Sequence, residues 1–122
     1  MTKSYPEITR RIVGGIRTLR KEIPDTMAGF SAMAGAATKD GALSTKTKEL
    51  IALAIGVATR CDGCIGFHMA ALVKAGATRD EVEEALGRAV YMGGGPALMY
   101  AADAILAFEQ FSEKHGGAVS TG

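Results

Sequence analysis

Residues 49–68 have the sequence ELIALAIGVATRCDGCIGFH, from which both the fold and the chemistry of the chain can be predicted. Its first half is apolar almost all the way round a helix, which predicts a helix that is buried on most sides. Its second half contains a Cys-x-x-Cys pair, Cys61 and Cys64, with His68 four residues later. At helical spacing these three side chains lie on one stripe. Glu49 lies on the preceding helix, so it meets that stripe only if the two helices pack antiparallel.

The remaining chain predicts an all-α protein, a single-domain helical bundle over residues 1–122 with a flexible tail at 115–122. A chain of 122 residues is short enough to form one hydrophobic core. We find no alternating run of apolar and polar residues that is long enough to predict a strand. Apolar periodicity and local punctuation predict about six helices, at residues 6–23, 25–37, 45–59, 61–75, 78–92 and 96–114.

Helix start and stop signals determine these boundaries. Pro24 ends the first helix, because the residue before a proline avoids the helical region. Gly76 stops the fourth helix, and Thr78 with Glu81 forms a capping box that starts the fifth. The side chains of the second helix that we expect to face the core are those of Met27, Phe30, Met33 and Ala34.

Composition argues against several classes of function. The formal net charge is +1, too balanced for a typical nucleic-acid-binding domain, so no nucleic-acid partner is expected. No uncharged apolar stretch approaches the roughly 18 residues that span a bilayer, so no membrane partner is expected. No secretory signal is recognisable, which makes a cytoplasmic location the default expectation. We interpret the basic residues near the N-terminus as a solvated helix face: Lys3, Arg10, Arg11, Arg17, Arg20 and Lys21.

The close cysteine pair points to thiol chemistry. In a reducing compartment such a pair is more often catalytic, redox-sensing or metal-binding than a structural crosslink. A thiolate near a helix N-terminus is stabilised by unpaired backbone N–H groups and the helix dipole, so Cys61 is the preferred nucleophile by this reasoning alone. Cys64 is then spaced to close a disulfide. His68 can take up the thiol proton, and Glu49 can orient the imidazole if the helices bring the two together.

Other interpretations of the same residues carry different chemistry. Zinc is one of them, because Cys61, Cys64 and His68 are suitable ligands and Glu49 could be a fourth. A structural zinc site, however, normally takes its four ligands from two secondary-structure elements, and the sequence has no second Cys-x-x-Cys. Two inert buried cysteines with a core histidine are a further possibility. Glu49 itself fits an exposed residue near a helix start, where negative charge is favourable. We therefore expect a redox pair and no bound metal.

The motif Lys-Glu-Leu-Ile-Ala-Leu-Ala at residues 48–54 precedes Cys-x-x-Cys-x-x-x-His, with Glu49 twelve positions before Cys61. This combination resembles the alkylhydroperoxidase D-like group of the carboxymuconolactone decarboxylase superfamily. The resemblance covers roughly residues 27–108 and is strongest over 43–76. The segment Gly-Ala-Thr-x-x-Glu-Val-x-Glu-Ala-Leu at residues 76–86 also looks like this group.

The resemblance implies a thiol-dependent peroxidase or disulfide reductase that is all-helical and assembles through helix faces into trimers or hexamers. By this resemblance Cys64 is the thiolate that attacks peroxide, and Cys61 is the resolving partner that closes the disulfide. Glu49 and His68 would form the proton relay. The expected partners are a hydroperoxide substrate, an external dithiol electron donor and further copies of the chain, and no cofactor is expected.

One departure from the resemblance concerns the residue between the cysteines. The peroxidase members of the group have a histidine within this pair, whereas the chain has Gly63. Its loss removes a polar group beside the thiols and lowers the expected peroxidase efficiency. Asp62 adds a second effect, because a carboxylate beside Cys61 raises the thiol pKa by like-charge repulsion.

Two other functions are open from the sequence. The first is a lyase of the decarboxylase type, in which His68 and Glu49 move protons on a carboxylated lactone and Arg60 or Arg88 binds its carboxylates. The second is a non-enzymatic oligomeric redox sensor, in which the disulfide changes packing. Apolar residues after the glycine run at 93–95 are candidates for a subunit contact or for simple core: Met92, Leu98, Met99 and Tyr100.

Overall fold

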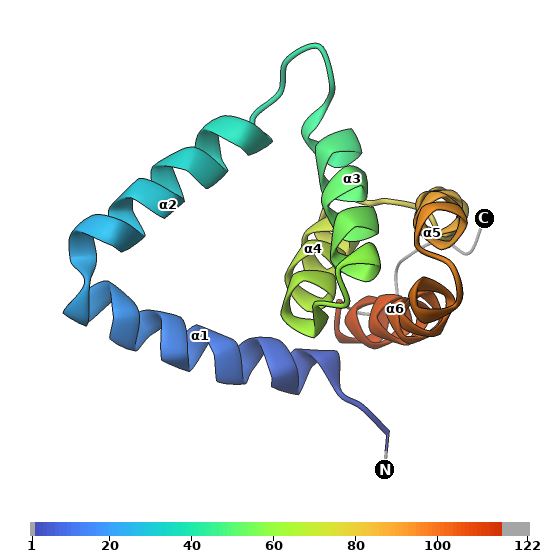
Figure 1. Ribbon diagram of the computed structural model, residues 1–122, viewed down its shortest axis with the longest axis horizontal. Helices are drawn as coiled ribbons and strands as arrows, with labels where there is room; N and C mark the ends of the chain where they lie inside the picture. The colour runs from blue at the N-terminus through green and yellow to red at the C-terminus, as the bar shows by residue number, and fades with distance from the viewer. Residues whose placement is uncertain (1, 116–122) are drawn as a thin grey trace.

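The computed structural model describes residues 2–115, and over these residues it contains helices and no strand (Figure 1). The prediction of an all-α bundle of about six helices is confirmed. The predicted tail at 115–122 lies outside the described residues except for His115, which caps the last helix. The six helices are α1 (Tyr5–Glu22), α2 (Pro24–Thr38), α3 (Thr45–Ala58), α4 (Asp62–Lys74), α5 (Arg79–Gly93) and α6 (Gly95–Lys114).

Local capping explains why the helix boundaries were predictable. The side chain of Ser44 accepts a hydrogen bond from the backbone N–H of Thr47 at the start of α3. At the start of α5, both bonds of the capping box form between Thr78 and Glu81. These interactions involve residues only three apart, so they can be read without knowing the tertiary structure.

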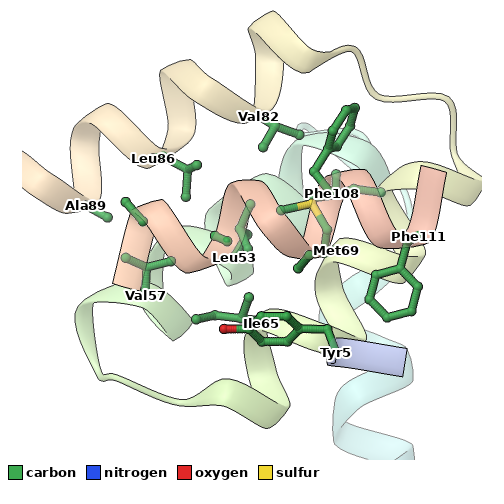
Figure 2. Close-up of a cluster of buried hydrophobic side chains, with 14 of the residues drawn as sticks. Tyr5, Leu53, Val57, Ile65, Met69, Val82, Leu86, Ala89, Phe108 and Phe111 are labelled. Atoms are coloured by element: carbon green, nitrogen blue, oxygen red, sulfur yellow. The ribbon is translucent and has the colours of Figure 1, made fainter. Parts of the chain in front are cut away.

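Helices α3, α4, α5 and α6 enclose the core of the bundle (Figure 1). Leu53 of α3 and Met69 of α4 lie at its centre, with Phe108 of α6 beside them (Figure 2). Tyr5, at the start of α1, closes the core from below and is completely buried. Alanines of α6 complete the packing and let that helix lie close to its neighbours.

Helices α1 and α2 form an open V that projects from the bundle (Figure 1). The first half of α1 packs on α4 and α6, whereas α2 contacts only α1 and the start of α3. No residue of α2 is buried. The V therefore leaves one long face of apolar side chains without cover in the single chain.

The predicted inward face of α2 is wrong for the isolated chain. Phe30 is 60% exposed and Met33 is 62% exposed, Ala34 is also exposed, and only Met27 is half-buried. The physical reason is that α2 swings away from the bundle, so no second element covers it. The expectation that α3 is buried on most sides holds except along one stripe of the helix, where Ile51 is 45% exposed and Ile55 is 57% exposed.

The basic residues of α1 are solvent-exposed, as expected for a solvated helix face. Lys3, which precedes the helix, is an exception because its ammonium group contacts two carboxylates of other helices. Of the candidate contact residues around the glycine run, Met92, Leu98 and Met99 are exposed in the single chain. Tyr100 is half-buried. Among the helices described, none combines the length and the apolar character that crossing a membrane requires.

Candidate functional site

Glu49 and His68 meet because α3 and α4 pack antiparallel. The Nδ1 atom of His68 lies 2.9 Å from Oε2 of Glu49. Glu49 is only 9% exposed, so the interpretation of an exposed residue near a helix start is wrong. A carboxylate can only accept a hydrogen bond, so Nδ1 carries the proton and donates it. The Nε2 atom of His68 is thereby left to accept a proton.

A tight turn joins α3 to α4 and delivers the cysteine pair. The N–H of Cys61 donates to the carbonyl of Gly56 (2.9 Å), and the N–H of Arg60 donates to that of Val57 (3.1 Å). Arg60 adopts a left-handed backbone with φ of 60°, a conformation that favours glycine. The equivalent turn after α4 uses Gly76, with φ of 79°. Of these two turns, the one that precedes the cysteines therefore places a non-glycine residue, Arg60, in the left-handed conformation.

Cys61 and Cys64 are joined by a disulfide, and their Cα atoms lie 5.2 Å apart. Cys61 is the N-cap of α4, and its sulfur accepts a hydrogen bond from the N–H of Cys64 at 3.1 Å. Both residues are half-buried rather than sealed in the core. His68 lies one helical turn beyond Cys64, on the same helix. The four predicted residues are thus gathered at the packed α3–α4 pair.

Gly56 allows α3 and α4 to approach closely at this point. A Cβ added to Gly56 would lie 2.9 Å from Cβ of Cys64 and 3.6 Å from its backbone carbon. Neither neighbour is the free end of a flexible side chain, so a larger residue must push the helices apart. The packing distance between the helices therefore depends on this glycine.

We expect Gly56→Ala to lower the free energy of unfolding by about 1–3 kcal/mol, because overpacking a close helix contact forces backbone shifts. Gly87→Ala is the matched control, since nothing lies within 4 Å of a Cβ at that exposed position of α5. The control should gain about 0.5–1 kcal/mol from helix propensity. Urea unfolding followed by circular dichroism measures both. Equal stability of the Gly56→Ala variant and the original chain would contradict the close approach.

Gly63, between the two cysteines, lies under α1. A Cβ added there would be 2.7 Å from Cδ1 of Ile12. A side chain at this position therefore requires the Cδ1 end of the Ile12 side chain to shift. The chain thus has glycine in place of the histidine of the resembled group at a position that α1 covers.

Asp62, the other residue between the cysteines, belongs to a polar network that the sequence did not reveal. Oδ1 of Asp62 accepts a hydrogen bond from the hydroxyl of Tyr5 at 2.8 Å and from Nζ of Lys3 at 3.2 Å. Nζ of Lys3 also donates to Oδ2 of Asp103 at 2.6 Å. Tyr5 and Asp62 are 57 positions apart, and no spacing pattern links them. Only the packing of α1 on α4 brings them together.

A model of the carboxymuconolactone decarboxylase family matches residues 24–107, which is more than half of the chain. The chain belongs to the carboxymuconolactone decarboxylase family. The predicted superfamily is thereby confirmed. The matched residues include all of α2 to α5 and most of α6, and therefore all four predicted site residues.

Two solved structures of the carboxymuconolactone decarboxylase family are similar to this chain. The apo form of a member from Legionella pneumophila is 61% identical, with a TM-score of 0.87 over 88% of this chain and 96% of that one. A member from Thermotoga maritima, a candidate for involvement in the antioxidative response, is 30% identical, with a TM-score of 0.75 over 90% and 98% of the two chains. An uncharacterized protein from Cupriavidus necator is 42% identical over 86 residues, covering 70% of this chain and 76% of its own length.

A pocket of about 350 Å³ opens beside the Glu49–His68 pair of this carboxymuconolactone decarboxylase family member. It lies between α2, α3 and α4. Lys48 is its only basic side chain apart from His68. Its other lining residues are mostly small or apolar: Ala34, Ala37, Thr38, Ile51 and Ala52. The pocket therefore suits an apolar molecule beside the imidazole better than one with several carboxylates.

The two arginines that the lyase interpretation requires do not line this pocket. Arg60 is exposed in the α3–α4 turn, and Arg88 is exposed on α5, where its guanidinium lies over the ring of Tyr91. For the zinc interpretation, no group of three or more His, Cys, Asp or Glu side chains within residues 2–115 is arranged to hold a metal ion.

Proposed function

We propose that this carboxymuconolactone decarboxylase family protein is a thiol-dependent peroxidase or disulfide reductase that acts through Cys61 and Cys64. The observation that carries the proposal is that the buried Glu49 carboxylate lies 2.9 Å from the imidazole of His68. His68 in turn lies one helical turn after Cys64, which forms a disulfide with Cys61. A nucleophile, a base and a group that orients the base are the usual parts of an activated thiol site.

The proposed cycle begins with the Cys64 thiolate, whose proton has passed to the relay. The thiolate attacks the terminal oxygen of a hydroperoxide, so that an S–O bond forms as the O–O bond breaks. The product alcohol leaves with a proton from His68. Cys61 then attacks the sulfenic acid, which closes the disulfide and releases water. An external dithiol donor returns two electrons and two protons to the pair.

The hydrogen bond to the Cys61 sulfur suits the resolving role. The N–H of Cys64 lies in the half-buried first turn of α4 and donates to this sulfur at 3.1 Å. It would stabilise Cys61 as a thiolate, both when it attacks the sulfenic acid and when it leaves during reduction of the disulfide. The same contact would also support Cys61 as the first nucleophile, so the order of the two thiols requires a separate experiment.

We also propose that the chain acts as a homo-oligomer. The exposed apolar side chains on the V, together with those on α5 and α6, exceed what an isolated small domain usually leaves in water. Trimers and hexamers, an external dithiol donor and a cytoplasmic location remain predictions from the sequence and its resemblance. An oligomeric redox sensor would use the same disulfide without turnover, which separates it from the peroxidase experimentally.

The first test is the pH dependence of alkylation of the two reduced thiols by iodoacetamide, measured for each cysteine by mass spectrometry. We expect one thiol to react rapidly at pH values well below about 8.5, the ordinary thiol pKa, because the helix N-terminus and the relay stabilise its thiolate. His68→Ala should slow that thiol, while replacing the exposed Lys74 on the same helix by Ala should not. Two slow thiols with ordinary pH dependence would contradict the proposed function.

A further inference from the structure

The Cys-x-x-Cys pair contains a residue that works against its chemistry. Asp62 lies between Cys61 and Gly63, at the first position of α4. A carboxylate here favours the helix, because negative charge suits its N-terminus. The same negative charge disfavours a thiolate on either neighbouring cysteine. An unpaired Asp62 would therefore oppose the activation that a peroxidase or reductase needs.

We propose that Lys3 neutralises Asp62, that Tyr5 stabilises the carboxylate by a hydrogen bond, and that the two together hold the thiol pKa of the cysteine pair low. This inference rests on the proposed function, since it concerns the reactivity of the same thiols. Lys3 and Tyr5 act through Asp62, so they are positioning residues and not catalytic ones. Neither lies within the motif, and both come from the segment that precedes and starts α1.

The contacts to Asp62 come from two different groups. Nζ of Lys3 lies 3.2 Å from Oδ1 and 3.3 Å from Oδ2, so the ammonium faces both oxygens of the carboxylate. The hydroxyl of Tyr5 donates to Oδ1 at 2.8 Å. The side chains of Lys3 and Asp62 are each 34% exposed, so water screens this pair only partly.

Lys3 is held in place from several directions, which is unusual for a lysine near a chain terminus. Its ammonium donates to Asp103 at 2.6 Å and lies 5.5 Å from the centre of the Tyr100 ring. Its backbone carbonyl accepts a hydrogen bond from Nε2 of Gln110 at 2.8 Å. The Oε1 atom of the same glutamine accepts the backbone N–H of Tyr5 at 2.8 Å. Gln110 thus fixes this segment against α6 and holds the cation over Asp62.

The protonation states of the two groups are stable across the neutral range. The hydrogen bond to Asp103, followed by the contact with Asp62, raises the pKa of Lys3 above its ordinary value. Burial, followed by the hydrogen bond to Asp62, raises the pKa of Tyr5 far above its ordinary value, so the hydroxyl remains a donor. The other charged groups around the cysteine pair are the Glu49–His68 pair, which the variants below leave unchanged, and the exposed Arg60.

The test measures the apparent pKa of the more reactive thiol from iodoacetamide alkylation at an ionic strength of about 0.1 M, where the Debye length is about 10 Å. It begins with three variants of the full chain. Lys3→Met should raise this pKa by about 0.5, which is a roughly threefold slower reaction at pH values below the pKa, where few of the thiols are ionised. Asp62→Asn should lower it by a similar amount. The double variant Lys3→Met/Asp62→Asn should return to within about 0.2 of the original value, because it loses one charge of each sign.

Lys21→Met is the matched control, since it removes an exposed cation at the far end of α1. That end lies roughly 24 Å along the helix from Tyr5, beyond the screening length at ordinary ionic strength. The control should leave the thiol pKa unchanged. Tyr5→Phe is a second variant that keeps the ring in the core, and it should raise the thiol pKa by a smaller amount than Lys3→Met.

The outcomes separate this inference from the proposed function. An unchanged thiol pKa in both Lys3→Met and Tyr5→Phe overturns the inference, even if the original thiol is fast and the peroxidase proposal stands. An equal rise in Lys3→Met and in the double variant also overturns it, because the lysine would then act independently of Asp62. A slow thiol in the original chain overturns the proposed function, while the pattern among the variants still decides the role of Lys3.

Discussion

Replacing Cys64 by Ser should abolish peroxide turnover, with a loss of at least roughly a thousandfold in the rate of consumption. A serine hydroxyl is not ionised at neutral pH, so it cannot replace the attacking thiolate. The reaction is followed as the loss of hydrogen peroxide or cumene hydroperoxide, with dithiothreitol as the donor. The variant should fold normally, because Cys64 is only half-buried and serine is slightly smaller.

Cys61→Ser separates the two thiols when peroxide consumption is measured without the donor, because dithiothreitol would itself reduce a sulfenic acid. If Cys64 attacks first, the Cys61→Ser variant consumes about one equivalent of peroxide in the first turnover and forms a sulfenic acid that mass spectrometry detects. The Cys64→Ser variant should show no such burst. The reverse pattern would make Cys61 the first nucleophile, as its place at the start of α4 suggests by itself. Retained steady turnover in both single variants would contradict the peroxidase proposal.

Glu49→Gln should slow peroxide consumption by about 10- to 100-fold at neutral pH, because the relay loses the charge that stabilises the protonated imidazole of His68. In the original chain Nδ1 of His68 lies 2.9 Å from Oε2 of Glu49. Glutamine has the same shape as glutamate, and its side-chain oxygen can still accept this hydrogen bond. The substitution therefore removes a charge and keeps the geometry. The rate is measured by stopped-flow under single-turnover conditions, so the donor does not limit it.

The sign of the Glu49→Gln effect is informative. If Glu49 acted on the thiols only as a nearby negative charge, its removal would lower the thiol pKa and make the reaction faster. A relay through His68 predicts a slower reaction. A rate equal to or above that of the original chain would therefore contradict the relay. Glu84→Gln is the matched control, because Glu84 is exposed on α5 and should leave the rate unchanged.

The open V formed by α1 and α2 explains which sequence predictions failed. The apolar residues of α2 led to the prediction that Phe30 and Met33 face the core. In the single chain both are more than half exposed. Apolar periodicity by itself does not say whether a face packs on the same chain, on another copy or on nothing.

The residue between the cysteines gives a second example. Sequence comparison within the resembled group treats Gly63 as the loss of a histidine. In the structure the position lies against Ile12 of α1, where a side chain has no room unless Ile12 moves. Only the packing of α1 on α4 shows that a side chain at this position would meet the Cδ1 end of Ile12, a flexible group that would have to shift.

The six helices, their approximate boundaries and the family could all be predicted from the sequence alone. Capping boxes, prolines and glycines act over three or four residues, and apolar periodicity is likewise a property of one helix, so both survive in the linear sequence. Only the tertiary structure decided that Glu49 is buried against His68, and that Lys3 and Tyr5 reach Asp62. These contacts join segments that are far apart in the chain, and their existence depends on how closely neighbouring helices pack. No local rule specifies that distance, because it is set by the side chains of both helices together.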